Sequence, residues 1–284
     1  MDAGELLRRY AAGERDFREI KLTRVNLVNA DLRDVNFREA HLIEVNLSGS
    51  NLTGVNFREA NLSGSNLGGA MLQECNLIGA NLLGANLMGS DLSGSSLRSA
   101  NLSEVNLRSA NLSDAIVGEA NLSGANLYGT NLTGAHLSRA RLVETCLEHA
   151  ILDNANLSGS VLNGANLTGA RLSQAVLSGA SLEGANLSDA DLTRANLGST
   201  NLRRANFTNA KMRGASLIWS SLRGAKMIRV NLYRAKLNWS NLSEADLSEA
   251  ILIDTNLRRA NLRDANLQNA NLSGATMPNG QVFA

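Results

Sequence analysis

The sequence predicts an all-β solenoid in which one short unit repeats along almost the whole chain. Three observations predict it: a period of five residues, small side chains at one place in the period, and glycine at another. From Leu22 to Met277 every fifth residue is apolar, which makes 52 consecutive pentads without an insertion. An unbroken period of this kind outweighs ordinary propensity arguments, because it defines a stacked repeat architecture.

Each pentad predicts one side of a coil. Residues 120–134, with the sequence ANLSGANLYGTNLTG, show its commonest form. A period of five fits neither a helix nor a long strand, but it fits a short extended segment followed by a corner. The small residue and the Leu lie two apart and therefore point inward together, whereas the Asn between them points outward. The fifth position turns the corner, and 19 of the 25 glycines fall there, where freedom from Cβ strain suits a bend.

The pattern A-(N/D)-L-x-x of residues 120–134 resembles the pentapeptide-repeat family, and the resemblance covers about nine-tenths of the chain. It implies a right-handed quadrilateral β-helix with four pentads per coil, and hence about 13 coils. A rise of about 4.8 Å per coil, the ordinary strand spacing, would make it roughly 60 Å long. The start of the chain looks like that of the cyanobacterial members of the family, many of which have no assigned biochemical role.

The unbroken phase predicts a single uninterrupted β-helix over residues 17–277. Residues 1–16 break the pattern, and the capping-box spacing of Asp2 and Glu5, with Gly13 as a stop signal, predicts a short α-helix. We expect this helix to cover the first coil, the alternative being a helix that binds a partner. Residues 278–284 form a short C-terminal tail that gives thin cover, so both a monomer and an end-to-end homodimer through the C-terminal coil are open.

No apolar run approaches the length of a membrane span, and the N-terminus lacks the apolar core of a signal peptide. We therefore expect a cytoplasmic protein with no membrane partner. Cys75 faces inward and Cys146 outward, and they lie too many coils apart to form a disulfide. Two structural thiols in a reducing compartment are the expectation.

The sequence offers no cluster of residues for catalysis. The three histidines lie on different coils without acidic or thiol neighbours at ligand spacing, and no Ser has a His and a carboxylate placed to activate it. Nothing resembles a loop that cradles phosphate. We therefore expect no catalytic, cofactor-binding or metal site, no cofactor, and no enzyme activity.

Charge is unevenly distributed along the chain. Residues 1–191 hold 14 basic against 21 acidic residues, whereas residues 192–243 hold ten basic residues and no acidic one. We call residues 192–243 the basic collar. It is either a solvated surface that keeps coils from pairing wrongly, or a site for an anionic partner. Its members are Arg194, Arg203, Arg204, Lys211, Arg213, Arg223, Lys226, Arg229, Arg234 and Lys236.

The basic collar also holds the two tryptophans. Trp219 and Trp239 are twenty residues apart, which places them on one side, one coil apart, at the exposed corner position. Exposed Trp with Arg around it is typical of an interface hot spot; the alternative is that the two rings merely stack and shield the coil edge. The candidate partner-binding residues are Trp219, Trp239, Ile218, Tyr233, Arg203, Arg204 and Arg223.

The resemblance also suggests a function to weigh. The best-known activity in the family is protection of type II topoisomerases by members that mimic duplex DNA in shape and negative charge. This chain departs from that pattern, because its net charge is +1 and a basic collar interrupts it. The first expectation is therefore a non-catalytic, rod-like scaffold or protein-interaction module whose protein partner is unknown. The alternative is a DNA-mimicking or nucleic-acid-related modulator of a type II topoisomerase, although binding of nucleic acid itself is disfavoured.

Overall fold

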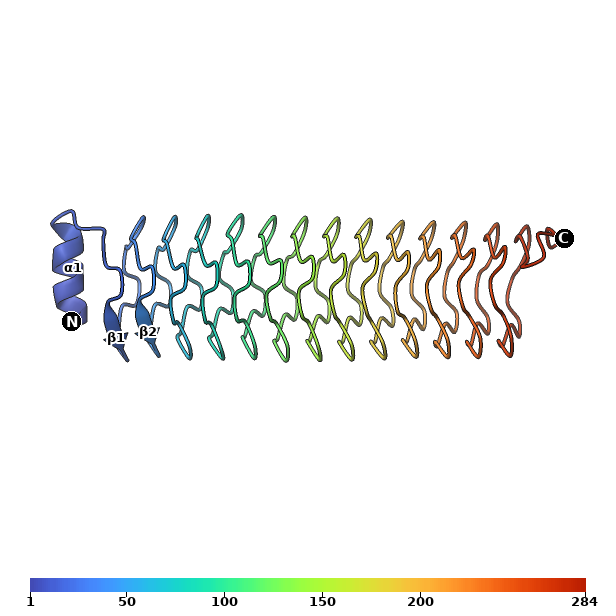
Figure 1. Cartoon of the computed structure of the whole chain (residues 1–284), viewed down its shortest axis with the longest axis horizontal. Helices are drawn as coiled ribbons and strands as arrows, with labels where there is room; N and C mark the ends of the chain where they lie inside the picture. The colour runs from blue at the N-terminus through green and yellow to red at the C-terminus, as the bar shows by residue number, and fades with distance from the viewer. The chain divides into compact units, whose positions relative to one another are not determined.

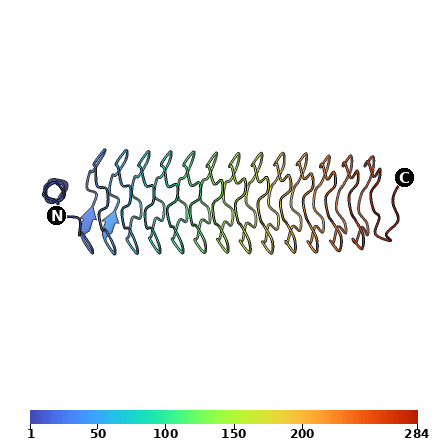
Figure 2. The ribbon, with the colours of Figure 1, turned by 90° about the horizontal axis from the view of Figure 1, so that it is seen from above.

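The computed structural model describes all 284 residues, which form two compact units, Met1–Arg141 and Leu142–Ala284. Within each unit the chain winds in coils that stack one beside the next (Figures 1 and 2). Parallel bridges join residues twenty apart, such as Asn46 with Asn66 in the first unit and Asn186 with Asn206 in the second. Four pentads therefore make one coil in both units.

Only three elements are long enough to be named, and all lie in the first unit: α1 (Ala3–Ala11), β1 (Lys21–Thr23) and β2 (His41–Ile43). β1 and β2 pair in parallel, with Lys21 opposite His41. Elsewhere the extended part of a side is so short that a single bridge per side joins neighbouring coils. The all-β prediction is thus met by ladders of bridges rather than by long strands.

The core consists of the two inward positions of every pentad. Leu32 and Leu62 in the first unit, and Leu157 and Ala165 in the second, have no exposed surface. Inward serines and threonines are accommodated because their hydroxyls donate to backbone carbonyls: Ser160 donates to the carbonyl oxygen of Leu157 at 2.6 Å. The predicted inward assignment is confirmed, and buried polar groups on this face are satisfied.

The corners place the fifth residue of the pentad in the left-handed region. Gly124 has φ +68°, and even Glu104 and Trp219 have φ +57° and +62°. The N–H of the corner residue still reaches the next coil, as from Gly49 to the carbonyl oxygen of Gly68 at 2.9 Å. No β-branched residue occupies any corner from residue 19 to residue 274, as expected for a conformation that such residues rarely adopt.

Helix α1 begins where the capping pattern predicts. Asp2 accepts a hydrogen bond from the backbone N–H of Glu5 at 2.8 Å, and Gly13 follows the helix with φ +97°. Leu6 is fully buried and Arg9 lies 5.2 Å from the ring of Phe17, a residue of the first coil. The helix therefore covers the N-terminal coil of the first unit, as predicted (Figure 1).

The C-terminal tail pairs with the last coil of the second unit without covering it. Thr276 and Val282 form an antiparallel bridge, and the N–H of Phe283 donates to the carbonyl oxygen of Ala275 at 2.8 Å. The side chains of Val282 and Phe283 remain exposed, while Leu262 in the coil beneath is half-buried. The thin cover expected from the sequence is what the structure has.

Candidate partner-binding surface

Trp219 and Trp239 form a stacked pair at one corner of the second unit. Their ring centroids lie 4.7 Å apart with an angle of 12° between the planes, as expected from their spacing of twenty residues. Trp219 is 60% exposed and Trp239 is 40% exposed. Arg259, a further twenty residues on, lies 4.2 Å over the other face of Trp239. One column of corners thus presents two indole rings closed at one end by a guanidinium group.

A small hollow of about 290 Å³ lies beside this column, lined by Asn238, Asn256 and Arg258 together with Trp239 and Arg259. The side-chain Oδ1 of Asn238 is buried there without a hydrogen-bond partner. A buried acceptor of this kind costs free energy until it meets a donor. The surface therefore combines a flat apolar face with a neighbouring buried acceptor that has no partner within the chain.

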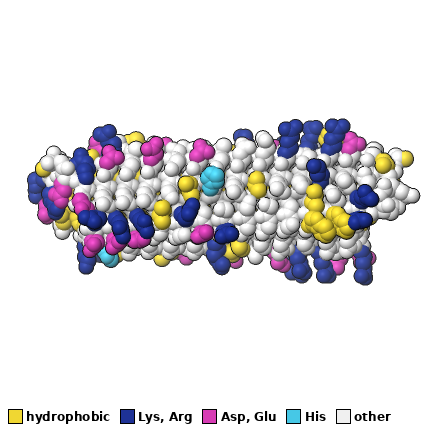
Figure 3. Space-filling model, turned by 45° about the horizontal axis from the view of Figure 1, so that its top comes forward, with side chains coloured by type: hydrophobic (Ala, Val, Ile, Leu, Met, Phe, Trp, Pro, Cys, Tyr) yellow, Lys and Arg dark blue, Asp and Glu magenta, His cyan; other side chains and the backbone are white.

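Ile218, half-buried, precedes Trp219 on the same side and extends the apolar part of this surface. Figure 3 shows hydrophobic side chains gathered towards the C-terminal end of the chain, with Lys and Arg side chains at both margins of the view. Trp219, Trp239 and Ile218 are therefore the predicted site residues that the structure brings together. We call these three residues with Arg259 the Trp surface.

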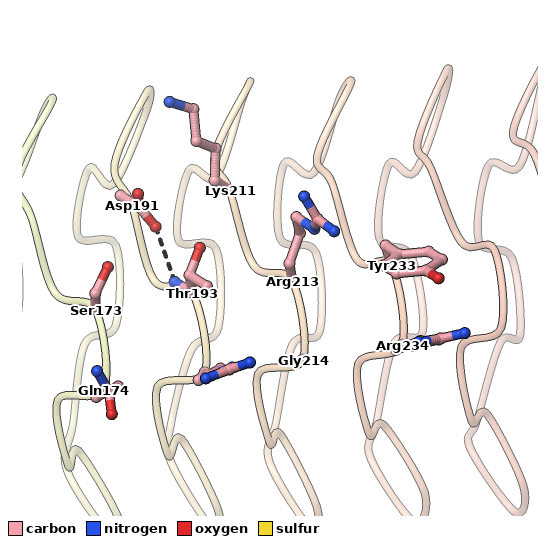
Figure 4. Close-up of a pocket in the computed structure, with 10 residues that line it drawn as sticks. Ser173, Gln174, Asp191, Thr193, Lys211, Arg213, Gly214, Tyr233 and Arg234 are labelled. Carbon is pink, nitrogen blue, oxygen red and sulfur yellow. Dashed lines mark hydrogen bonds between the residues drawn. The ribbon is translucent and has the colours of Figure 1, made fainter.

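Tyr233 does not belong to the Trp surface. Its ring lies between two guanidinium groups, 5.2 Å from that of Arg213 and 4.8 Å from that of Arg234. It lines a larger hollow, of about 610 Å³, on the side of the coil that precedes the side carrying the tryptophans (Figure 4). The Tyr233 ring and the Trp surface therefore occupy separate hollows.

Arg203, Arg204 and Arg223 line a third hollow, of about 140 Å³, with Gly224 and Glu244. An ion pair of 2.8 Å joins Arg223 to Glu244, a residue just beyond the basic collar. The positive charge here is thus partly balanced. The seven predicted residues accordingly fall into three groups on different sides of the second unit.

Sequence reasoning missed Arg259, which completes the Trp surface, and Arg258, which lines the hollow beside it. Both lie outside the acid-free stretch that defined the basic collar. The signal that finds Arg259 is the same spacing of twenty residues that pairs Trp219 with Trp239.

The structure contains no group of three or more His, Cys, Asp or Glu side chains able to hold a metal ion. Cys75 and Cys146 are both free thiols. The one helix, α1, is too short and too polar to pass through a bilayer.

Comparisons with known proteins agree with this architecture. The family model for pentapeptide repeats matches residues 16–54, 56–238 and 240–277 in overlapping segments. The chain is 34% identical over its whole length to the whole of HetL, a pentapeptide repeat protein involved in heterocyst differentiation regulation from the cyanobacterium Nostoc sp. strain PCC 7120, with a TM-score of 0.46. No curated protein sequence matches the chain.

Two other solved structures are similar over part of the chain. A trypsin-treated form of QnrB1, a plasmid-mediated fluoroquinolone resistance protein, is 19% identical over 64% of this chain and 88% of that one, with a TM-score of 0.46. The pentapeptide repeat protein alr5209 of Nostoc is 30% identical over 49% of this chain and 80% of that one, with a TM-score of 0.19. The match to the pentapeptide-repeat family model over most of the chain, with the coil of four pentads, confirms the right-handed quadrilateral β-helix predicted from the sequence.

Proposed function

Because this chain belongs to the pentapeptide-repeat family, we propose that it is a non-catalytic scaffold that binds a partner protein through the Trp surface. The observation that carries the proposal is the exposed stack of Trp219 and Trp239, capped by Arg259. Tryptophan and arginine are the residues most enriched in interface hot spots. The fold needs neither ring in its core, since both side chains lie outside the coil.

The Trp surface is also pre-organised for binding. Each indole is held by its neighbour in the column, so little side-chain freedom is left to lose when a partner docks. The corner backbone adds to this, because Trp219 and Trp239 both hold the left-handed conformation, with φ +62° and +64°. A large aromatic residue at such a position has a conformational cost that a glycine would avoid. A partner with an apolar or planar group fits this surface best.

The similarity to HetL supports a regulatory role rather than a catalytic one, since HetL is described as involved in regulation of differentiation. The alternative predicted from the sequence, a modulator of type II topoisomerase, has no specific observation in its favour in this chain. It stays a prediction that a gyrase supercoiling assay checks. We further propose a cytoplasmic location, which fractionation of cells that express a tagged chain would test.

The test is capture of a partner from a nuclease-treated lysate of the source organism. Wild type is compared with the Trp219→Ala/Trp239→Ala variant and with a control, Met71→Ala/Met88→Ala, which removes two exposed apolar side chains from the first unit. We expect a protein that wild type and control retain and the Trp variant loses. If wild type, control and Trp variant all captured the same proteins, the Trp pair would be only a stack that shields the coil edge. Melting curves of all three establish that each is folded.

A further inference from the structure

The hollow that contains Tyr233 is a candidate site of a different kind. It lies on the side of the second unit built from residues 170–174, 190–194, 210–214 and 230–234, which are successive coils (Figure 4). Four cations line it, from three of these coils: Arg194, Lys211, Arg213 and Arg234. Bridges between Asp191 and Lys211, and between Lys211 and Asn231, set neighbouring coils in register. We call this hollow the basic groove.

The concavity has a simple origin. Gly214 occupies the corner between Arg194 and Arg234, and it leaves a gap in a row of long side chains. A Cβ there would lie 3.6 Å from Cγ of Arg194, which is ordinary contact, so the gap comes from the missing side chain and not from crowding. Ser173 and Thr193 keep the next row shallow. The basic groove therefore forms where small residues interrupt a wall of cations.

The cations of the basic groove are mostly free of internal partners. Arg234 pairs with Asp254 at 3.2 Å, but neither Arg194 nor Arg213 has a carboxylate within ion-pair distance. The Tyr233 ring holds Arg213 and Arg234 on its two sides. Cation–π contacts of this kind orient a guanidinium group without neutralising it. The charge thus remains available to a ligand, in a fixed arrangement.

One carboxylate, that of Asp191, lines the basic groove. It accepts a hydrogen bond from the backbone N–H of Thr193 at 2.9 Å. Burial by itself raises the pKa of Asp191, but hydrogen bonds from the Thr193 hydroxyl and backbone, with the charge of Lys211, outweigh it and lower the pKa. A fixed negative charge among the cations disfavours a continuous phosphate backbone. It suits a ligand that carries N–H donors as well as acidic groups, and a polypeptide is such a ligand.

The length of the row of cations in the basic groove also favours a polypeptide ligand. From the coil of Arg194 to that of Arg234 there are two coil spacings, or about 10 Å at an ordinary strand spacing. Beyond this row the same side carries Asp153, paired with Arg171, and Asp254. An extended chain covers that distance in about three residues. From this geometry we infer that the basic groove binds a short, extended, acidic segment of a partner protein, which contributes two or three carboxylates.

The test uses a fluorescein-labelled hexapeptide of alternating Glu and Ser, with the corresponding Gln peptide as the neutral probe. Fluorescence anisotropy at low salt is expected to show binding of the acidic peptide alone, weakening as salt is added. In the Lys211→Gln/Arg213→Gln variant the affinity should fall by roughly tenfold or more, because hydrogen bonds to charged groups are lost. Both side chains are exposed, so the variant should fold normally.

The matched control is Arg203→Gln/Arg204→Gln, which removes the same charge from the basic collar outside the basic groove. Its affinity should change by less than about twofold, since long-range effects are screened. Equal losses in both variants would reduce the binding to a general charge effect and overturn the inference. Tighter binding of a duplex oligonucleotide than of the peptide, lost in the same groove variant, would assign the basic groove to nucleic acid instead. The Trp surface is not touched, so this assay and the capture experiment can fail independently.

Discussion

Asn86 donates a hydrogen bond through Nδ2 to Oδ1 of Asn66, 2.9 Å away and twenty residues earlier. Its own Oδ1 accepts from Nδ2 of Asn106 at 3.0 Å and from the backbone N–H of Met88 at 3.2 Å. One amide side chain thus ties together three coils and the residue that precedes its own corner. This explains why Asn, rather than any polar residue, recurs between the two inward positions.

Replacement of Asn86 by Ala should lower the free energy of unfolding of the first unit by about 1–3 kcal/mol, because three hydrogen bonds of modest net value are removed. The control is Asn231→Ala in the second unit, where the Asn side chain accepts only from the N–H of Tyr233. Urea unfolding followed by circular dichroism measures both. If the Asn231 variant lost as much unfolding free energy as the Asn86 variant, the hydrogen bonds between Asn side chains of neighbouring coils would contribute nothing to stability.

The inward Leu position should not tolerate a polar residue. Leu157 is fully buried, so Leu157→Asn loses its transfer free energy and buries an amide without partners. We expect a loss of at least about 3 kcal/mol, seen as a large drop in melting temperature. Val161→Asn makes a comparable change at the half-buried outward position where the repeat favours Asn, and should leave the melting temperature unchanged or higher. An unchanged melting curve for Leu157→Asn would contradict the inward assignment.

The corner conformation should select against β-branched residues. Gly124 has φ +68°, and a Cβ there meets only Cγ of Glu104 at 3.7 Å, which is ordinary contact. Gly124→Val is therefore strained by its backbone rather than by space, at a cost of about 1–3 kcal/mol. Gly124→Asn should be close to neutral, because Asn tolerates this region. Thermal unfolding of the pair checks this, and equal stability of the Val and Asn variants would refute it.

The two thiols should differ sharply in reactivity. Burial raises the pKa of Cys75 to about 12, so its thiolate is almost absent at pH 8, and the side chain is inaccessible as well. Cys146 is partly exposed. Iodoacetamide at pH 8 should therefore add one equivalent to the native protein, at Cys146, and a second only after denaturation. Mass spectrometry of the peptides decides the site, and early labelling of Cys75 would contradict its burial.

Asp191 should contribute to stability in a pH-dependent way. Its pKa is lowered in the folded state from an ordinary value of 3.8. Its contribution is therefore complete above that ordinary value and is lost as the pH falls through the lower, folded-state pKa. Asp191→Asn should melt at a lower temperature than wild type at pH 7, with the two curves converging below about pH 4. Melting temperatures measured from pH 7 to pH 2 test this; a constant difference would show that ionisation is not the cause.

The twenty-residue register made the fold and one part of the site predictable. Once four pentads make a coil, the inward position of Leu157 and the stack of Trp219 on Trp239 follow from residue numbers alone. The charged surface was harder to predict, because the basic collar was defined by consecutive residues along the chain. Residues that are neighbours in space lie on adjacent coils, twenty positions apart. Asp254 lies outside the acid-free stretch yet pairs with Arg234, since the two residues are one coil apart.

Tyr233 shows what the spacing predicts and what it leaves out. The spacing of twenty residues places Tyr233 on the side next to that of the tryptophans, and in the structure its ring lies near Arg213 and Arg234 on that side. Arg213 is twenty residues before Tyr233, so the twenty-residue spacing predicts that these two side chains meet. The depth of the basic groove cannot be predicted from the twenty-residue spacing, because it depends on how the side chain of Arg194 lies across the gap at Gly214.

Because the pentad period is strict, inserting or deleting one pentad moves all later residues to another side of the coil. Removal of five residues between Trp219 and Trp239 would leave every inward position filled, yet Trp239 would turn by a quarter of a circle onto the neighbouring side. Insertion of twenty residues would instead keep Trp239 on its original side, two coils from Trp219 rather than one. Length changes that the core does not sense can therefore assemble or dismantle a binding surface in one step.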